Sequence, residues 1–314
     1  MKPCLAVVGS LNMDFVVTVP HLPAPGETVL GGGFQMVPGG KGANQACAGA
    51  RLGGPAVTVR MAGRVGYDVF ADHLKASLSA AGVDVSAVHA TRAQPTGVAL
   101  IWVDRTGQNS IVVASGANHE LRAADAGSLR QVFRGAGWAL FQLETPLETV
   151  RAALRLAREE GARTILDPAP AQRLDGEFLA LADILTPNET EALILLGRPP
   201  ARVPAEEAPL LSAALRALGA RQVVLKLGDQ GCFFDDGLRR LHVPAFPVEV
   251  RDSTAAGDIF NAGLAVALAE GRAVEDALRF ASAAAAISVT RLGAQASVPA
   301  RAEVEAFLSA RSQG

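Results

Sequence analysis

The stretch "DSTAAGDIFNAG" at residues 252–263 places an acid, Asp258, where a helix is expected to begin, behind a glycine and two alanines. These small residues permit a tight turn whose N–H groups point outward, and apolar residues after Asp258 anchor the helix. The turn predicts an anion hole formed by Ala255, Ala256 and Gly257. The acid could simply favour the helix dipole. Because phosphoryl transfer needs positioning, charge neutralisation and a base, we interpret Asp258 as a candidate base.

Around this turn, short apolar runs alternate with longer helical patterns. Residues 5–8, 164–167 and 223–227 read as buried strands, whereas residues 148–160 and 210–219 read as amphipathic helices. The alternation predicts an α/β fold, a three-layer α/β/α core with a mostly parallel sheet. With 314 residues and 49% hydrophobic content, the chain can bury one large core.

Two stretches break the alternation. Residues 15–37 and 96–114 read as strands joined by Pro/Gly turns, the second as a hairpin around "DRTG" at 104–107. Neither has a helical pattern, so we expect them to form a small β-sheet lid. The core then comprises residues 1–14, 38–95 and 115–314.

Composition excludes several classes of protein. The net charge of −2 and the single Tyr and two Trp argue against a nucleic-acid partner. Cys4, Cys47 and Cys232 are odd in number and far apart, which suits reduced thiols in the cytoplasm. We expect no histidine-bound metal, since the five histidines are scattered. No apolar run has the length of a signal-peptide core or of a membrane helix, and we expect neither.

A glycine-rich loop opens the segment "PGGKGANQACAGARLGG" at 38–54. Its N–H groups could bind an anion or sugar hydroxyls, or the loop could be only a flexible turn and cap. Lys41 is followed by Gly42, so the P-loop pattern of Walker-type ATP sites is not met. The glycine fingerprint of a dinucleotide site is missing after the first strand, which disfavours an NAD-dependent dehydrogenase.

Three further motifs each have a structural alternative. "GSLNMD" at 9–14 puts Asn12 and Asp14 after a buried strand, where they could bind sugar hydroxyls or stabilise a turn. "PNETE" at 187–191 reads as a capping box of Asn188 and Glu191. "KLGDQG" at 226–231 follows another strand and has glycines that a nucleotide could approach.

Together these motifs resemble the ribokinase, or pfkB, family of carbohydrate kinases. The family's two signatures match "GGKGANQA" at 39–46 and residues 252–258. Further matches cover nearly the whole chain and include "PGET", "TGVALI", "QLETP", "DPAPA", "TPNETEA" and "GAQASVP". The resemblance implies an α/β core that carries a β lid.

The resemblance also implies a function. It indicates an ATP-dependent, Mg²⁺-requiring kinase that phosphorylates the 5-hydroxyl of D-ribose, is stimulated by K⁺ and forms a homodimer through the lid. Asp258 would be the general base, and Gly257 part of the anion hole. The alternatives are a kinase for deoxyribose, fructose or a nucleoside, and a non-catalytic sugar-binding protein.

The site residues carried over from the family fall into three groups. The positions expected to bind the sugar are Asn12, Met13, Asp14, Gly40, Lys41, Gly42, Ala43, Asn44, Glu144 and Asp258. The positions expected to bind the nucleotide are Asn188, Lys226, Leu227, Gly228, Asp229, Gln230, Gly231, Gly257, Asp258 and Ser282. The positions expected at metals are Glu191, which acts on Mg²⁺ through water, and, for K⁺, Asp252, Thr254, Ser288, Arg291, Gly293 and Ser297. Ser282 departs from the family, because relatives often carry a histidine there beside the adenine.

Overall fold

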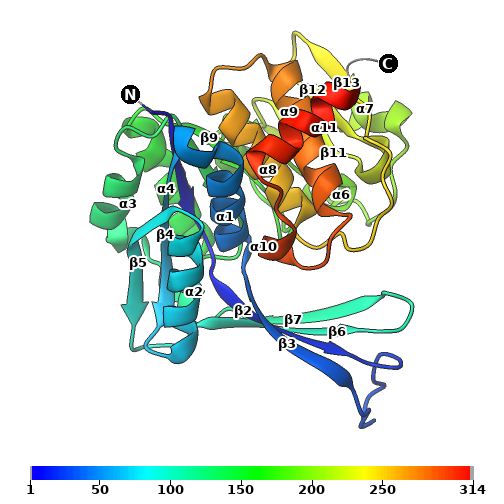
Figure 1. Ribbon diagram of the computed structural model, residues 1–314. Coiled ribbons are helices and arrows are strands. Elements are labelled where there is room, and N and C mark those ends of the chain that lie inside the picture. The colour runs from blue at the N-terminus through cyan, green and yellow to red at the C-terminus, as the bar shows by residue number, and fades with distance from the viewer. Residues whose placement is uncertain (1, 312–314) are drawn as a thin grey trace.

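The computed structural model describes residues 2–311, which are built around a nine-stranded sheet (Figure 1). The strand order is β13-β12-β11-β10-β9-β8-β1-β4-β5. Neighbouring strands from β5 to β11 are parallel, while β12 is antiparallel to both β11 and β13. The predicted α/β fold with a mostly parallel sheet is confirmed. The strands are β1 Cys4–Val8, β4 Thr58–Gly66, β5 Val83–Thr91, β8 Trp138–Phe141, β9 Arg163–Leu166, β10 Ile184–Leu185, β11 Val223–Lys226, β12 Cys232–Asp235 and β13 Arg240–Val243.

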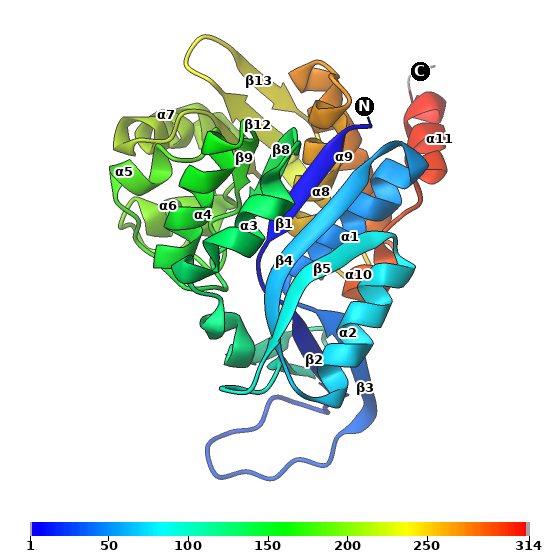
Figure 2. The same cartoon turned by 90° about the vertical axis from the view of Figure 1, so that its left-hand side faces the viewer.

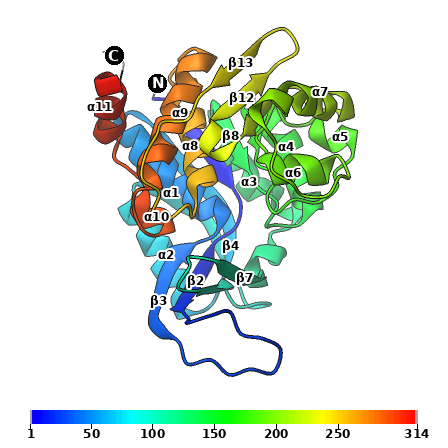
Figure 3. The same cartoon turned by 90° about the vertical axis from the view of Figure 1, so that its right-hand side faces the viewer.

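Helices cover both faces of this sheet. Successive side chains of a strand point to opposite faces, so Leu5 and Val7 of β1 join one core and Ala6 and Val8 the other. Helices α1, α2, α8, α9 and α11 pack on the first core and α3 to α7 on the second, as Figures 2 and 3 show. The helices are α1 Lys41–Gly53, α2 Val69–Ala80, α3 Ala126–Phe133, α4 Leu147–Glu159, α5 Gly176–Leu179, α6 Glu189–Leu195, α7 Ala208–Leu218, α8 Ala256–Ala269, α9 Val274–Ser288, α10 Ala294–Ser297 and α11 Arg301–Arg311.

A second sheet of four strands projects from one end of the main sheet (Figure 1). Its order is β3-β2-β6-β7, from β2 Asn12–Thr18, β3 Gly32–Gly39, β6 Gly97–Val103 and β7 Asn109–Ala114. The hairpin expected around 104–107 joins β6 and β7, with Gly107 at a φ of 83° in its turn. This sheet begins at Asn12, ahead of residue 15 where we expected the lid to start, because Asn12 already pairs with Gly39 and Gly97.

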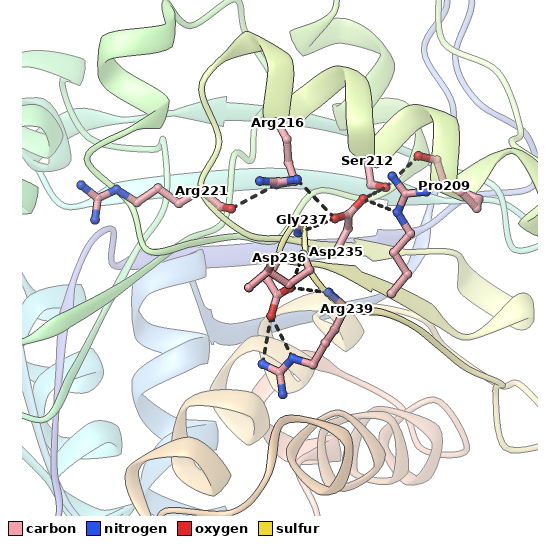
Figure 4. Close-up of polar contacts among 10 residues, drawn as sticks. Pro209, Ser212, Arg216, Arg221, Asp235, Asp236, Gly237 and Arg239 are labelled. Atoms are coloured by element: carbon pink, nitrogen blue, oxygen red, sulfur yellow. Dashed lines mark hydrogen bonds and ion pairs between the residues drawn. The ribbon is translucent and has the colours of Figure 1, made fainter.

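The fully buried Asp235 stabilises the β12–β13 hairpin through hydrogen bonds (Figure 4). Its Oδ2 accepts hydrogen bonds from the Ser212 hydroxyl at 3.0 Å and from Arg240 Nε at 3.2 Å. Its Oδ1 accepts from the Gly237 N–H at 2.8 Å and faces an Arg216 guanidinium nitrogen at 3.6 Å. Both oxygens of this carboxylate are therefore satisfied within the fold.

The parallel strands end at the edge of the main sheet from which the second sheet projects. The segments after β1, β8, β9, β10 and β11 leave from this edge, which is where α/β sheets bind ligands. Across residues 2–311, no helix combines the length and the apolar character needed to cross a membrane.

Candidate active site

The turn before α8 has the geometry of an anion-binding site. Ala255, the residue before the helix, has a φ of 59°, in the left-handed region that residues other than glycine rarely adopt. Ala256, which we expected to contribute its N–H to the anion hole, does not, because this N–H donates to the Ser253 carbonyl at 3.2 Å. The N–H groups of Gly257 and Asp258 have no acceptor among residues 2–311. Two donors at a helix N-terminus are therefore available to an anion.

Asp258 is buried in the first turn of α8, with its side chain against α1. Its two carboxylate oxygens accept hydrogen bonds from Asn44 Nδ2 at 3.2 Å and Gln45 Nε2 at 3.0 Å. Burial raises the pKa of Asp258 and outweighs the opposing effect of the nearby Lys41 charge, so that the pKa is about 6. A carboxylate with a raised pKa beside anion-binding N–H groups is suited to accept a proton near neutral pH.

The loop between β3 and α1 meets the segment after β8. Glu144 accepts a hydrogen bond from the Lys41 backbone N–H at 3.1 Å and another from the Ser10 hydroxyl. Burial lowers the pKa of the Lys41 side chain, but the carboxylates around it, first Asp258 and then Asp167, outweigh burial and raise the pKa above its usual value. Lys41 is therefore a positive charge surrounded by acids.

Asp14 completes this group of charges from the first strand of the second sheet. Its side chain is 8% exposed, and its Oδ1 has no hydrogen-bond partner among the described residues. Burial, together with the negative charges of Glu144 and Asp258, raises the pKa of Asp14 to about 7. Gly39 must be a glycine, since a Cβ there would lie 2.0 Å from Asp14 Oδ2. An unsatisfied buried oxygen of this kind is costly and indicates a binding position.

The other positions expected to bind the sugar differ in what they can offer. Asn12 Oδ1 accepts a hydrogen bond from Asn118 Nδ2 at 2.7 Å. The side chains of Met13 and Ala43 lie in the hydrophobic core, so only their backbone can face a ligand. Gly40, at a φ of 87°, and Gly42 approach residues 9–12 so closely that a Cβ would clash with the backbone there.

Asn188 and Glu191 form the predicted capping box at the start of α6. Asn188 Oδ1 accepts from the Glu191 N–H at 2.8 Å, and Glu191 Oε2 accepts from the Asn188 N–H at 2.7 Å. Asn188 also forms a parallel bridge with Lys226, the last residue of β11. The capping box is structural, yet it leaves Glu191 Oε1 without a protein partner among the residues described.

Most polar side chains of the 226–231 loop, and Ser282, have partners within the fold. Asp229 pairs with Arg202 at 2.8 Å on the surface. The Gln230 side chain hydrogen-bonds the backbone of 203–205. Ser282 is buried on α9, with its hydroxyl 3.8 Å from Cys232 Sγ. Leu227 is buried, and Gly228 and Gly231 have positive φ, so this loop can offer a nucleotide mainly backbone.

The two segments expected to bind K⁺ lie side by side. Asp252 Oδ1 accepts from the Thr254 N–H at 2.9 Å, and Asp252 Oδ2 accepts from the Gly293 N–H at 2.8 Å. The Ser288 and Ser297 hydroxyls donate to carbonyls of their own helices at 2.8 Å. The Arg291 side chain pairs with Glu303 and does not reach this loop. The segments are thus tied together, with backbone carbonyls left as possible ligands.

The sequence alone does not identify the buried polar residues behind Asp258. Gln45 Nε2 bonds Asp167 Oδ2 at 3.1 Å as well as Asp258, and Gln142 Nε2 bonds Gln45 Oε1 at 2.6 Å. Asp167 Oδ1 accepts from Lys226 Nζ at 3.0 Å. Gln142 and Asp167 lie within two motifs that carry the family resemblance, and Gln45 follows Asn44, but nothing in the sequence shows that they meet.

A buried carboxylate with a raised pKa, an anion-binding turn and a set of charged groups in one site are suited to phosphoryl transfer to a hydroxyl. Residues 2–301 match the family described as pfkB family carbohydrate kinase. The chain belongs to this family of sugar kinases.

Several relatives of known name are similar over nearly the whole chain. A ribokinase from Bacillus subtilis is 43% identical over 305 residues, 97% of this chain and 99% of the relative. A ribokinase from Haemophilus influenzae is 40% identical over 309 residues, 98% and 99% of the two chains. A deoxyribokinase from Salmonella typhi is 34% identical over 309 residues, 97% and 98% of the two chains. The structure of Arabidopsis thaliana ribokinase complexed with ribose and ATP superposes with a TM-score of 0.88 at 36% identity, covering 98% of this chain and 99% of the other.

Proposed function

We propose that this chain acts as a ribokinase, which transfers the γ-phosphoryl group of ATP to the 5-hydroxyl of D-ribose and gives ribose 5-phosphate and ADP. The observation that carries the proposal is the buried Asp258 beside the free N–H groups of its own turn. The named relatives support ribose as the sugar, since two of them at 40% identity or more are ribokinases.

Asp258 is the general base of the proposed reaction. Asn44 and Gln45 each donate to one of its oxygens, which fixes the plane of the carboxylate. The proton of the 5-hydroxyl passes to Asp258 while the hydroxyl oxygen attacks the γ-phosphorus in line. The N–H groups of Gly257 and Asp258 donate hydrogen bonds to the phosphoryl oxygens and so stabilise the negative charge on them.

The sugar is held between the two sheets. Asp14 comes from the small sheet and Glu144 from the segment after β8 of the main sheet, and both provide acceptors for sugar hydroxyls. Asp14 Oδ1 is buried and has no partner among the described residues, so a hydrogen bond from a ribose hydroxyl would satisfy it. Asn12, Lys41 and Asn44 provide further polar groups at the same place.

The nucleotide lies across the ends of β10 and β11 in this proposal, against Asn188 and the backbone of 228–231. Glu191 fits a Mg²⁺ ion held through water, because Mg²⁺ usually binds proteins through one or two carboxylates together with substrate phosphates. When bound, Mg²⁺ neutralises charge on the ATP phosphates.

We also propose that K⁺ binds between residues 252–254 and 288–297, largely through backbone oxygens. The hydrogen bond from the Gly293 N–H to Asp252 supports this, since it holds the two segments together next to the anion-binding turn. Activity should rise severalfold when K⁺ replaces Na⁺ at constant ionic strength. Equal rates in the two saturating salts would remove the cation from the proposal.

We propose a cytoplasmic homodimer that forms through the small sheet. This sheet exposes large apolar side chains on both faces, among them Phe34, Met36, Ile111 and Val112, which are 51–59% exposed. A surface of this kind favours burial against another chain. The three cysteines are free thiols, which suits the cytoplasm.

The main alternative is a deoxyribokinase, because one named relative has that activity. A coupled ADP-release assay over ribose, deoxyribose, fructose and nucleosides separates the two. We expect the highest kcat/KM with ribose. A higher kcat/KM with deoxyribose would establish the alternative, and ADP release with none of these acceptors would overturn the proposed function.

A further inference from the structure

Asn118 is a buried residue that contacts Asn12 from outside the segments expected to bind the sugar. It lies in the short 3₁₀ helix Gly116–Glu120, which follows β7 of the small sheet, and it is 1% exposed. This helix packs against β4 of the main sheet and β6 of the small one. The Asn118 side chain therefore lies where the two sheets meet, beside the first residue of β2.

The backbone of Leu11 fixes which way the Asn118 amide points. Asn118 Oδ1 accepts from the Leu11 N–H at 2.9 Å, and Asn118 Nδ2 donates to the Leu11 carbonyl at 3.2 Å. A backbone N–H only donates and a backbone carbonyl only accepts, so the reversed amide would place like groups together at both contacts. Asn118 Nδ2 is therefore a donor whose position is set by the fold.

Asn118 in turn fixes the amide of Asn12. Asn118 Nδ2 donates to Asn12 Oδ1 at 2.7 Å. Both amides pack closely on Gly97, where a Cβ would lie 2.3 Å from Asn12 Oδ1 and 2.4 Å from Asn118 Nδ2. The other end of the side chain, Asn12 Nδ2, has no acceptor in the part of the chain that the structure describes. Asn12 can therefore offer a ligand N–H donors, because its oxygen is already engaged.

We propose that Asn118 is a positioning residue for the sugar, which acts through Asn12 by keeping it a hydrogen-bond donor toward a ribose hydroxyl. The inference rests on the proposed function. Asn12 and Asp14 are two residues apart on β2, so their side chains leave the same face of the strand. Ionised Asp14 has only acceptors, whereas Asn12 held in this way has only donors to offer. A hydroxyl group both donates and accepts, so the pair is matched to sugar hydroxyls.

A simpler role for Asn118 is to satisfy the buried backbone of Leu11. A double-mutant cycle with Asn12 separates the two roles. Asn118→Ala removes the contacts with both Leu11 and Asn12, whereas in an Asn12→Ala background only the Leu11 contacts remain to be lost. The difference between the two backgrounds therefore reports the part of the effect that passes through Asn12. Asn118→Leu has nearly the same branched shape and repeats the comparison without leaving a cavity.

In the parental background, Asn118→Ala should raise the KM and the Kd for ribose about tenfold, the usual effect of one lost hydrogen bond, with the KM for ATP unchanged. In the Asn12→Ala background the same substitution should change the ribose values less than about twofold. Isothermal titration calorimetry with ribose measures the Kd of each variant. Equal fold-changes in the two backgrounds, or a parental ribose Kd in folded Asn118→Ala, would overturn the inference. Ribose-dependent ADP release by the parental enzyme tests the proposed function separately.

Discussion

The buried carboxylates at opposite edges of the main sheet differ in their surroundings. Asp235 lies at the edge where β11 begins, since it pairs with Val223, and both of its oxygens have partners. Asp258 and Asp14 lie at the other edge, where Asp14 keeps an unpartnered oxygen and both pKa values are raised. A fully hydrogen-bonded acid such as Asp235 stabilises the fold, whereas a buried acid with a raised pKa or an unpartnered oxygen is typical of a ligand-binding or catalytic site.

The largest expected effect on stability is at the satisfied acid. Asp235→Ala leaves Arg216, Arg240 and the Ser212 hydroxyl without their shared acceptor, so the free energy of unfolding should fall by about 2–4 kcal/mol. The kcat per folded molecule should stay at the parental value. Chemical denaturation and ADP-release assays on one preparation measure both quantities. A lower kcat with an unchanged free energy of unfolding would contradict the structural role of Asp235.

Asp14→Asn should impair catalysis without lowering stability. The kcat/KM for ribose should fall about 10- to 100-fold, since a charged hydrogen bond to a sugar hydroxyl is lost, while ATP affinity is kept. The pKa of Asp14 is about 7 in the folded protein and 3.8 in the unfolded chain. Between these two values the unfolded chain loses a proton that the folded protein keeps, so the stability falls as the pH rises. The variant should therefore unfold at a higher temperature than the parent at pH 7.5, by a margin that shrinks toward pH 5. A kcat/KM equal to that of the parent would exclude Asp14 from the site.

The pH dependence of kcat should report the raised pKa of Asp258. Below about pH 6 the base becomes protonated, so kcat at saturating ribose should fall about tenfold per pH unit. The far-UV circular dichroism spectrum at each pH serves as the control for folding. A constant kcat down to pH 5 would contradict the assignment of the base.

The smallest effect on catalysis is expected at the exposed part of the small sheet. Ile111→Lys/Val112→Lys places a charge on each face of β7, far along the chain from Asp258, and should abolish self-association with kcat close to parental. Leu238→Lys is the matched control, because Leu238 is 96% exposed in the β12–β13 turn of the main sheet. Sedimentation velocity measures the outcome. A dimer that survives in the double variant would show that association uses another surface.

The sequence predicts the parts of the site that depend on neighbours along the chain. The turn before α8 and the capping box of Asn188 and Glu191 follow from local spacing, and the α/β class follows from the alternation of apolar runs. The Asp167–Gln45–Asp258 contacts do not, because Gln45 and Asp167 are 122 residues apart and meet only through the strand order.

The start of the small sheet could not be predicted from the sequence for the same reason. Its start at Asn12 is fixed by pairing with Gly97, a partner that no local pattern identifies.

The most direct test of the central claim is the turnover of Asp258→Asn. Asn is nearly isosteric and is tolerated at a helix start, so the variant should fold and bind ATP like the parent. Its kcat with ribose should be lower by roughly 10²–10⁴, the usual range for loss of a general base. A folded Asp258→Asn enzyme that phosphorylates ribose at the parental rate would contradict the account.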